Sequence, residues 1–412
     1  ADRSRGLGDV YKRQATEAQR NGVLKEMGAT LIKRLEFIGV SHHKNKGMTA
    51  EEAVSRFTDH PNIEFIERNG YYELGEIPND PLFPEQWSLQ NIPDNPTDPI
   101  ADIRATNAWD IERGSDQIIV GVIDHVIDVD HPDLNPNLYR NYNEIPKNGI
   151  DDDNNGFIDD FYGIGYQGGS YTPTYTHGTA VAGVIGAKTD NEEGIAGVCW
   201  DVSIMKLGGQ LTYDGVALKI GYAIDNYVHI LNMSFTGSDV ETQWLACEAA
   251  DAAGIYMVCI AGNLSLDIDL HPYYPVCYTF DHIISVTGTD RKDQQSFNYG
   301  AESVDVGAPS YALTCYPGGT YEWVSGTSFS APHTSGVLAL MMSKYGPDSG
   351  VDFKAKLMET VDHLESLEGK CVSEGRINAF LALADPDYAA PATIRKVTIK
   401  EIASTWIELE WT

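Results

Sequence analysis

The chain has 412 residues, 42% of them hydrophobic, and carries 29 Lys and Arg against 60 Asp and Glu, a formal net charge of −31. This length is enough for two or three domains with a large core. A strongly acidic chain is a poor partner for nucleic acid or for an anionic membrane surface. No apolar run reaches about 18 residues, so we also expect no membrane span.

The N-terminal part of the sequence predicts a small unit of its own. Residues 1–14, "ADRSRGLGDVYKRQ", resemble translated adapter sequence, so we set them aside as non-native. Residues 15–76 read as a small α+β unit, with strands over 29–43, a helix over 49–61 and a strand over 63–74. A polar, Pro-rich connector follows.

From about residue 101, apolar runs typical of strands alternate with helical stretches. Strands that are apolar throughout indicate a parallel sheet covered by helices on both faces, an α/β fold. In such sheets the ligand-binding and catalytic residues lie at the carboxyl ends of the strands. The chain ends in two short alternating runs within residues 386–412.

Three short motifs carry candidate chemistry. Asp124 ends "IIVGVID", His177 opens "HGTAVAGVIGA", and Ser328 lies in "SGTSFSAPHTSG". The small residues after His177 would let a helix pack tightly, and an apolar helix begins at Ser328. Asp, His and Ser in this chain order match one of the three known orders of the catalytic triad of serine hydrolases.

These motifs resemble those of the subtilisin-like serine proteases, the subtilase family. The resemblance implies a subtilisin-like catalytic domain over residues 77–385, preceded by an inhibitory, ferredoxin-like propeptide over residues 15–76. It also implies a secreted endopeptidase that acts on proteins or peptides and is made as a zymogen, with cleavage between Tyr72 and Pro78. Residues 386–412 resemble a linker and the first strands of a truncated fibronectin type III domain.

The resemblance assigns roles to four residues. Ser328 would be the nucleophile, His177 the general base, and Asp124 the acid that orients the imidazole. The side-chain amide of Asn263, in "AGN", would join the first N–H groups of the helix at Ser328 in an oxyanion hole. Taken alone, each has an ordinary alternative, such as a turn, a helix cap or a loop acid.

The substrate channel is also inferred from the resemblance. Two segments would form the walls of the primary pocket and the edge that pairs with an extended peptide. Their residues are Ser234, Phe235, Thr236, Gly237, Ala261 and Gly262.

Two calcium sites are predicted, both structural, and we expect no catalytic metal. The loop "GIDDDNNGFIDD", residues 149–160, has oxygen ligands in an order similar to that of an EF-hand. Its expected ligands are Asp151, Asp153, Asn155, Phe157 through its carbonyl, and Asp160. A solvated acidic turn is the alternative. The second site follows from the resemblance alone and would use Asp80, Asp133, Asn191 and Ile195.

Two other functions stay open at this point. A catalytically impaired subtilase fold could bind peptides or act as a calcium-stabilised adhesive module. A metal-dependent hydrolase could use the acids and histidines of residues 124–131, but the chain lacks an HExxH motif.

The family places Ser or Thr and then Gly after the acid, whereas this chain has His125 and Val126, and Val is strained where φ is positive. We therefore expect reduced or altered activity.

Overall fold

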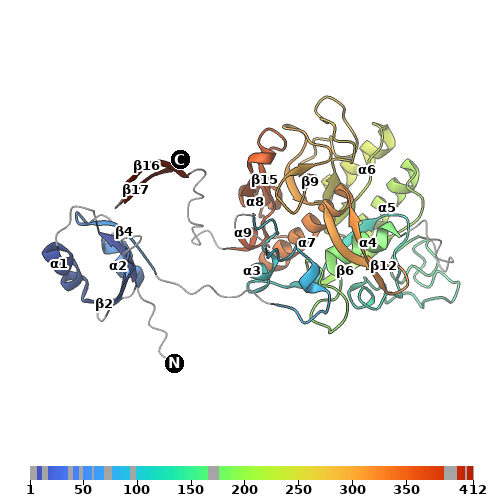
Figure 1. The fold of residues 1–412 in the computed structure, drawn as a ribbon. Helices are drawn as coiled ribbons and strands as arrows, with labels where there is room; N and C mark the ends of the chain where they lie inside the picture. The colour runs from blue at the N-terminus through green and yellow to red at the C-terminus, as the bar shows by residue number, and fades with distance from the viewer. Residues whose placement is uncertain are drawn as a thin grey trace. The chain divides into compact units, whose positions relative to one another are not determined.

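The computed structural model divides into two compact units, residues 1–74 and 75–412 (Figure 1). The structure describes residues 7–11, 17–35, 40–45, 50–57, 60–68, 77–92, 99–165, 176–384, 397–403 and 406–411. The predicted cleavage between Tyr72 and Pro78 falls mostly on residues 69–76, which lie outside the described residues.

The N-terminal unit has the order β1(Leu7–Tyr11), α1(Glu17–Met27), β2(Ala29–Leu35), β3(Val40–Asn45), α2(Ala50–Phe57), β4(Ile63–Arg68). Its strands form an antiparallel sheet in the order β2-β3-β1-β4. Val23 and Met27 on α1, and Ala53 and Phe57 on α2, are each four residues apart and bury one helix face. This β-α-β-β-α-β arrangement is ferredoxin-like, as predicted.

Leu7–Tyr11, within the segment that we set aside, form a strand of this sheet. β1 pairs with β3 on one side and with β4 on the other, whereas β4 pairs with no other strand of the sheet. The backbone groups of β4 would lose their partners without β1, because a strand cannot satisfy its N–H and C=O groups alone. Leu7–Tyr11 are therefore part of the sheet, and the assignment of residues 1–14 as non-native stays a prediction.

The larger unit is built on a parallel sheet, as the alternating pattern predicts. The parallel strands are β5(Gly114–Ile123), β6(Asp201–Leu207), β7(Ile230–Met233), β8(Tyr256–Ile260), β9(Ile283–Thr289) and β11(Val306–Pro309), in the spatial order β11-β9-β8-β7-β5-β6. Beyond β11 lie β15(Gly375–Arg376) and β14(Asp362–His363), and β10(Gln295–Ser296) pairs antiparallel with β9.

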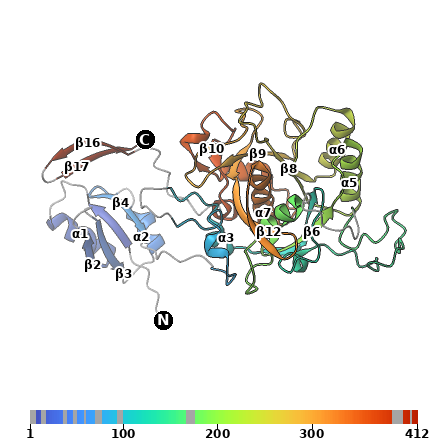
Figure 2. The ribbon, with the colours of Figure 1, turned by 45° about the vertical axis from the view of Figure 1, so that its right-hand side comes forward.

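Helices cover both faces of this sheet. α4(His177–Gly186) and α7(Thr327–Tyr345) pack with Val258 and Ile260 of β8 on one face. α5(Tyr213–Asp225) and α6(Glu241–Ala252) pack with Met257 and Cys259 on the other face and lie side by side (Figure 2). Successive side chains of a strand point to opposite faces of the sheet. A strand that is apolar throughout is therefore buried on both faces.

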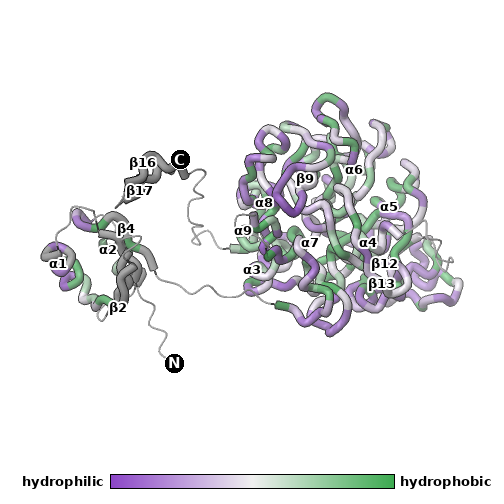
Figure 3. The backbone as a smooth tube through the Cα atoms, viewed as in Figure 1, coloured by the Kyte–Doolittle hydropathy of each residue, from purple (hydrophilic) through white to green (hydrophobic). Residues whose placement is uncertain are grey.

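Shorter elements complete the unit. They are η1(Phe83–Glu85), α3(Ala105–Trp109), η2(Asn135–Asn137), α8(Phe353–Glu359), η3(Glu365–Leu367), α9(Ala379–Leu383) and the hairpin of β12(Tyr311–Tyr316) and β13(Thr320–Ser325). Hydrophobic stretches concentrate toward the middle of the unit, and hydrophilic stretches toward its outer loops (Figure 3). Within the described residues, no helix combines the length and the apolar character needed to cross a membrane.

The cysteines and the C-terminal end of the chain complete the description. All six cysteines fall within the described residues and none forms a disulfide. The last part of the chain forms a hairpin of β16(Val397–Ala403) and β17(Trp406–Trp411). Two antiparallel strands agree with the alternating pattern, and their assignment to a fibronectin type III domain stays a prediction.

Candidate active site

The candidate acid and base lie at the carboxyl edge of the sheet. Asp124 follows β5 directly and is 2% exposed. His177 is the first residue of α4, and its Nδ1 lies 2.6 Å from Asp124 Oδ2. Because a carboxylate oxygen can only accept a hydrogen bond, Nδ1 carries the proton and Nε2 is left as the basic atom.

A glycine at position 178 permits this close approach. A Cβ on Gly178 would lie 2.5 Å from the carbonyl oxygen of Val126 and 3.0 Å from Cβ of Asp124. The hydroxyl of Thr179 accepts the N–H of Asp128 at 2.9 Å. The first turn of α4 is therefore docked on the segment after β5, as the small residues of the motif predict.

The environment of His177 raises its pKa. Burial of the ring lowers the pKa, but the hydrogen bond that the ring donates to Asp124 and the negative charge of Asp124 raise it by more, so the pKa lies above its ordinary value of 6.5. The protonated imidazole is thus stabilised, as a residue that accepts a proton during a reaction requires.

Ser328 lies in the first turn of α7. The N-cap of this helix, Gly326, has a φ of 135°, where a side chain would be strained. The carbonyl of Ser328 accepts the hydroxyl of Ser234 at 2.9 Å. The ring of the next residue, Phe329, lies 5.7 Å from that of His177. These contacts hold the serine at the positive end of a 19-residue helix.

Asn263 is tied to the residue that precedes this serine. Its Oδ1 accepts both the backbone N–H and the hydroxyl of Thr327, at 2.8 and 2.9 Å. With Oδ1 occupied in this way, the Nδ2 group is the part of the amide that can donate to a ligand. Asn263 itself is exposed, although the strand before it is buried.

The two residues that depart from the resemblance adopt an unstrained backbone. Neither His125 nor Val126 has a positive φ. The backbone N–H of His125 donates to Asp124 Oδ1 at 2.7 Å, and its Nδ1 lies 3.2 Å from the carbonyl oxygen of Gly209. The strain considered for Val126 is therefore absent, and a backbone N–H supports the acid.

The two predicted pocket walls face each other. Cγ2 of Thr236 lies 3.9 Å from where a Cβ on Gly262 would be, and Gly262 has a φ of 102°. Ser234 comes directly after β7, and the next residue in the chain, Phe235, is half-buried. Both walls thus stand at the carboxyl ends of neighbouring strands.

Gly237 and Ala261 depart from the predicted role. The N–H and carbonyl of Gly237 are already bonded to Tyr274, at 2.6 and 3.1 Å. Ala261 is fully buried, with its N–H bonded to Val286 and its carbonyl to Asn298. Because both N–H groups are already bonded, neither residue can donate a backbone hydrogen bond to an extended peptide.

The acidic loop brings together two of its predicted ligands and one residue that we did not predict. Carboxylate oxygens of Glu144, Asp153 and Asp160 lie within 4.8 Å of one another. Glu144 is 3% exposed, and its Oε2 is buried without a hydrogen-bond partner. Glu144 and Asp160 are buried and Asp153 is more exposed, and a cation would offset the combined charge of the three carboxylates. Glu144 lies outside the loop motif, which is why the motif did not reveal it.

The other predicted loop ligands have contacts of a different kind. The carboxylate of Asp151 accepts the N–H groups of Asn155 and Gly156 at 3.0 and 2.9 Å. Nδ2 of Asn155 donates to Asp153 and Asp160, and Phe157 packs its ring edge-on to Tyr222. The first position of the EF-hand order is therefore occupied in forming the turn, and the cluster differs from that order.

The four residues of the second predicted site also lie together. Asp133 Oδ1 accepts Nδ2 of Asn191 at 2.8 Å, and its Oδ2 accepts the N–H of Ile195 at 3.0 Å. Asp80 Oδ1 is buried without a partner. Burial and the charge of Asp80 raise the pKa of Asp133 to about 6. Two buried carboxylates that repel each other fit the donor set of a hard cation.

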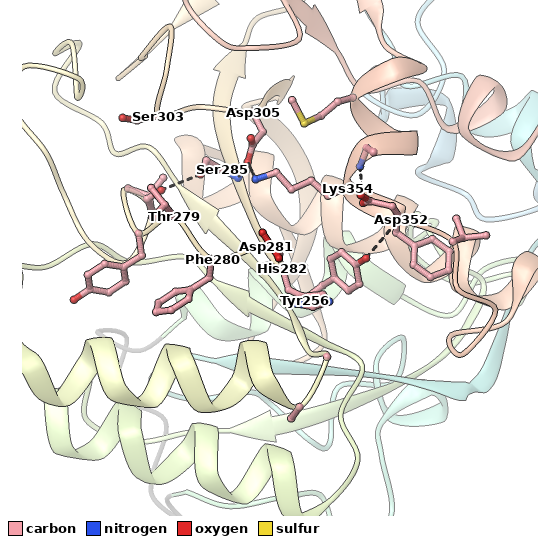
Figure 4. Close-up of a pocket in the computed structure, with 18 of the residues that line it drawn as sticks. Tyr256, Thr279, Phe280, Asp281, His282, Ser285, Ser303, Asp305, Asp352 and Lys354 are labelled. Atoms are coloured by element: carbon pink, nitrogen blue, oxygen red, sulfur yellow. Dashed lines mark hydrogen bonds and ion pairs between the residues drawn. The ribbon is translucent and has the colours of Figure 1, made fainter.

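A large hollow of the described residues lies away from the candidate triad. It has a volume of about 1170 Å³ and is lined by residues at the amino ends of the strands, among them Tyr256 and Ser285 (Figure 4). Its polar groups are paired, for example Lys354 Nζ with Asp305 Oδ2 at 3.1 Å. The candidate triad is at the opposite edge of the sheet, so this hollow is separate from it.

Comparison with known proteins identifies the family. The subtilase family matches residues 115–378, and the fervidolysin N-terminal prodomain matches residues 10–69. The chain belongs to the subtilase family. With its prodomain, this subtilase is a serine protease made as a zymogen, as the motifs predicted.

Individual relatives agree with this assignment. A thermophilic serine proteinase of Bacillus sp. strain AK1 is 28% identical, over 90% of this chain and 86% of the relative. Thermitase of Thermoactinomyces vulgaris is 31% identical, over 74% of this chain and 99% of the relative. Among solved structures, a protease of Pseudoalteromonas arctica has a TM-score of 0.58 at 26% identity and covers 75% of this chain and 99% of that one. Fervidolysin of Fervidobacterium pennivorans, at 22% identity and a TM-score of 0.55, supports the fold and covers 93% of this chain and 61% of that one.

Proposed function

We propose that this subtilase cleaves peptide bonds with Ser328 as nucleophile, His177 as general base and Asp124 as the orienting acid. The observation that supports this most is the 2.6 Å contact between His177 Nδ1 and Asp124 Oδ2. It leaves Nε2 as the base on a ring that packs against Phe329, the neighbour of Ser328.

The reaction follows from these positions. Ser328 Oγ bonds to the scissile carbonyl carbon while its proton passes to His177 Nε2. That proton then moves to the leaving amine as the C–N bond breaks. A water molecule attacks the acyl-enzyme in the same way and releases the new carboxylate together with free Ser328.

The oxyanion of each intermediate would be held by two kinds of donor. Asn263 Nδ2 is one, because its Oδ1 is already bonded to Thr327. The backbone N–H of Ser328 would be the other, because the N–H groups of Thr327 and Phe329 on either side of it are already bonded to Asn263 and Gly326. For the substrate, we keep Ser234, Phe235, Thr236 and Gly262 as pocket walls, without the paired backbone of Gly237 and Ala261.

We further propose two structural calcium sites. Glu144, Asp153 and Asp160 would hold one ion, with Asn155, the carbonyl of Phe157 and Asp151 as further ligands of the loop. Asp80, Asp133, Asn191 and a backbone oxygen of Ile195 would hold the other. Calcium would offset the charge of these buried carboxylates and takes no part in the reaction.

Secretion completes the proposal. One relative is named a halolysin-like extracellular serine protease, of Natrialba magadii, and it is 28% identical over 86% of this chain. The strongly acidic composition suits a soluble protein that holds cations outside the cell.

Self-processing of the full chain tests the triad. The parent should cut itself between Tyr72 and Pro78 in the presence of calcium, and Ser328→Ala should stay uncut. Ser349→Ala removes an exposed serine away from the site and should process like the parent. Processing that persists in Ser328→Ala, in protein free of other proteases, would exclude Ser328 as the nucleophile.

A further inference from the structure

Lys219 is a buried cation for which the proposed reaction has no use. It belongs to α5, is 4% exposed, and faces the sheet together with Val216 and Ile220. Burying an ammonium group is costly unless acceptors or opposite charges surround it. Its Nζ donates to the carbonyl oxygen of Gln210 at 2.7 Å. The side chain therefore reaches the segment that follows β6.

That segment is bonded in turn to the residue after the acid. The N–H of Gly209 donates to the carbonyl of His125 at 2.7 Å, and the Nδ1 of His125 donates to the carbonyl of Gly209 at 3.2 Å. Gly209 has a φ of 114°, and a Cβ there would lie 3.9 Å from Lys219 Nζ. The turn at residues 209–210 is thus held between His125 and Lys219.

The chain of contacts ends at the acid itself. His125 donates its backbone N–H to Asp124 Oδ1 at 2.7 Å, the oxygen that does not bond to His177. The resemblance expects a hydroxyl beside the acid. Here the ring of His125 bonds to Gly209, so the acid depends on a backbone N–H whose position the turn fixes.

An electrostatic interaction also links Lys219 with Asp124. Burial lowers the pKa of Lys219, and the negative charges of Asp124 and Asp214 oppose that effect. Asp214 is an exposed residue of α5, and its carboxylate is bonded to Thr212 and Gly215. Of the two acids that act on the pKa of Lys219, Asp124 is the buried one. We therefore take Asp124 as the acid whose charge Lys219 offsets inside the fold.

We propose that Lys219 is a positioning residue for Asp124, acting through the turn at residues 209–210 and the backbone of His125. It would fix the carboxylate and place a positive charge beside it. The charge of Lys219 then weakens the pull of Asp124 on the protonated His177. This inference rests on the proposed triad and adds to it a residue that its motifs do not contain.

The test is the pH dependence of kcat/KM for Lys219→Met, which keeps the length of the side chain and removes its charge. We expect the acid limb to move up by about 0.5–1 pH unit, because the positive charge of Lys219 would oppose protonation of His177 and is lost in this variant. We also expect kcat/KM at the optimum to fall about tenfold, because the acid is less well held. Lys219→Arg keeps the charge and should keep the acid limb of the parent.

A matched control is Lys206→Met on β6. Lys206 is 7% exposed, and the acid that acts on its pKa is Asp160 rather than Asp124. With calcium in excess, its acid limb should stay in place. Thermal unfolding establishes that each variant is folded. If Lys219→Met does not fold, Lys219→Gln against Lys219→Arg makes the same comparison.

Two results would overturn the proposal. One is a folded Lys219→Met or Lys219→Gln with the acid limb of the parent. The other is an equal shift in Lys206→Met, which would indicate a general effect of removing a buried lysine. Failure of the triad itself looks different, because the parent would then not react with a fluorophosphonate at any pH.

Discussion

The chemical role of each side-chain atom at the carboxyl edge of the sheet follows from the hydrogen bonds that its neighbours already make. Asp124 accepts from two neighbours, so His177 can use only Nε2 as a base. Thr327 occupies Oδ1 of Asn263, so only its Nδ2 can reach a substrate. The chemistry proposed for the site follows from these occupied atoms.

Asn263→Ala should lower kcat with little change in KM. The amide would act on the oxyanion, which exists only during the reaction, so its loss raises the barrier and leaves binding of the substrate unchanged. In this family, losing such a donor costs about 10²–10³ in kcat. Steady-state kinetics on a peptide substrate would measure it, and a loss below about threefold would argue against this donor.

The pH profile should show an acid limb governed by His177. The pKa of His177 is raised above 6.5, and only the neutral imidazole accepts a proton, so kcat/KM should fall as the pH drops through that raised pKa. Asp124→Asn removes the charge that raises the pKa while burial still lowers it. The limb should then move to lower pH, and kcat should fall by about 10⁴. A limb that moves upward would contradict this account.

At the scale of elements, the approach of α4 to the end of β5 sets the geometry. The helix begins at His177, and the absence of a side chain at Gly178 lets it rest on Val126 and Asp124. The motif predicts this packing, because small residues after the histidine have few other uses. The sequence did not reveal that Tyr274 pairs with Gly237, since that contact joins loops that are far apart in the chain.

Gly178→Ala and Gly221→Ala form a matched pair that tests this packing. The new Cβ at Gly178 would lie 2.5 Å from a backbone oxygen, whereas nothing lies within 4 Å of one at Gly221 on α5. We expect Gly178→Ala to lower the free energy of unfolding by about 1–3 kcal/mol and Gly221→Ala to leave it unchanged or raise it by about 0.5–1 kcal/mol. Denaturant unfolding measures both, and equal effects would contradict the packing described.

For the whole molecule, the motifs predicted the family, the resemblance to that family predicted the prodomain, and the alternating apolar and helical runs predicted the parallel sheet. They did not predict Glu144, which lies outside the loop that it joins, or Lys219, which resembles any helix residue until the fold buries it. β1 was missed for a similar reason: its residues lie in a segment that we had excluded on its sequence. Contacts between distant segments are what the sequence alone left out.

Calcium should raise the stability of the whole protein. Bound only by the folded state, calcium at about 100 times its Kd would add about 2.7 kcal/mol. Chelation should therefore lower the unfolding temperature, and Glu144→Gln should reduce that difference. Glu248→Gln, an exposed acid on α6, serves as control and should behave like the parent. If chelation leaves the unfolding temperature of the parent unchanged, both calcium sites are excluded.

Covalent labelling of the processed protein tests the central claim most directly. A fluorophosphonate reacts only with a serine that a neighbouring base activates, and mass spectrometry of the digested protein locates the adduct. We predict one adduct, on Ser328, which is lost in Ser328→Ala and forms far more slowly in Asp124→Asn. Folded, processed protein that takes up no label, or takes it up on another serine, would contradict the proposed triad.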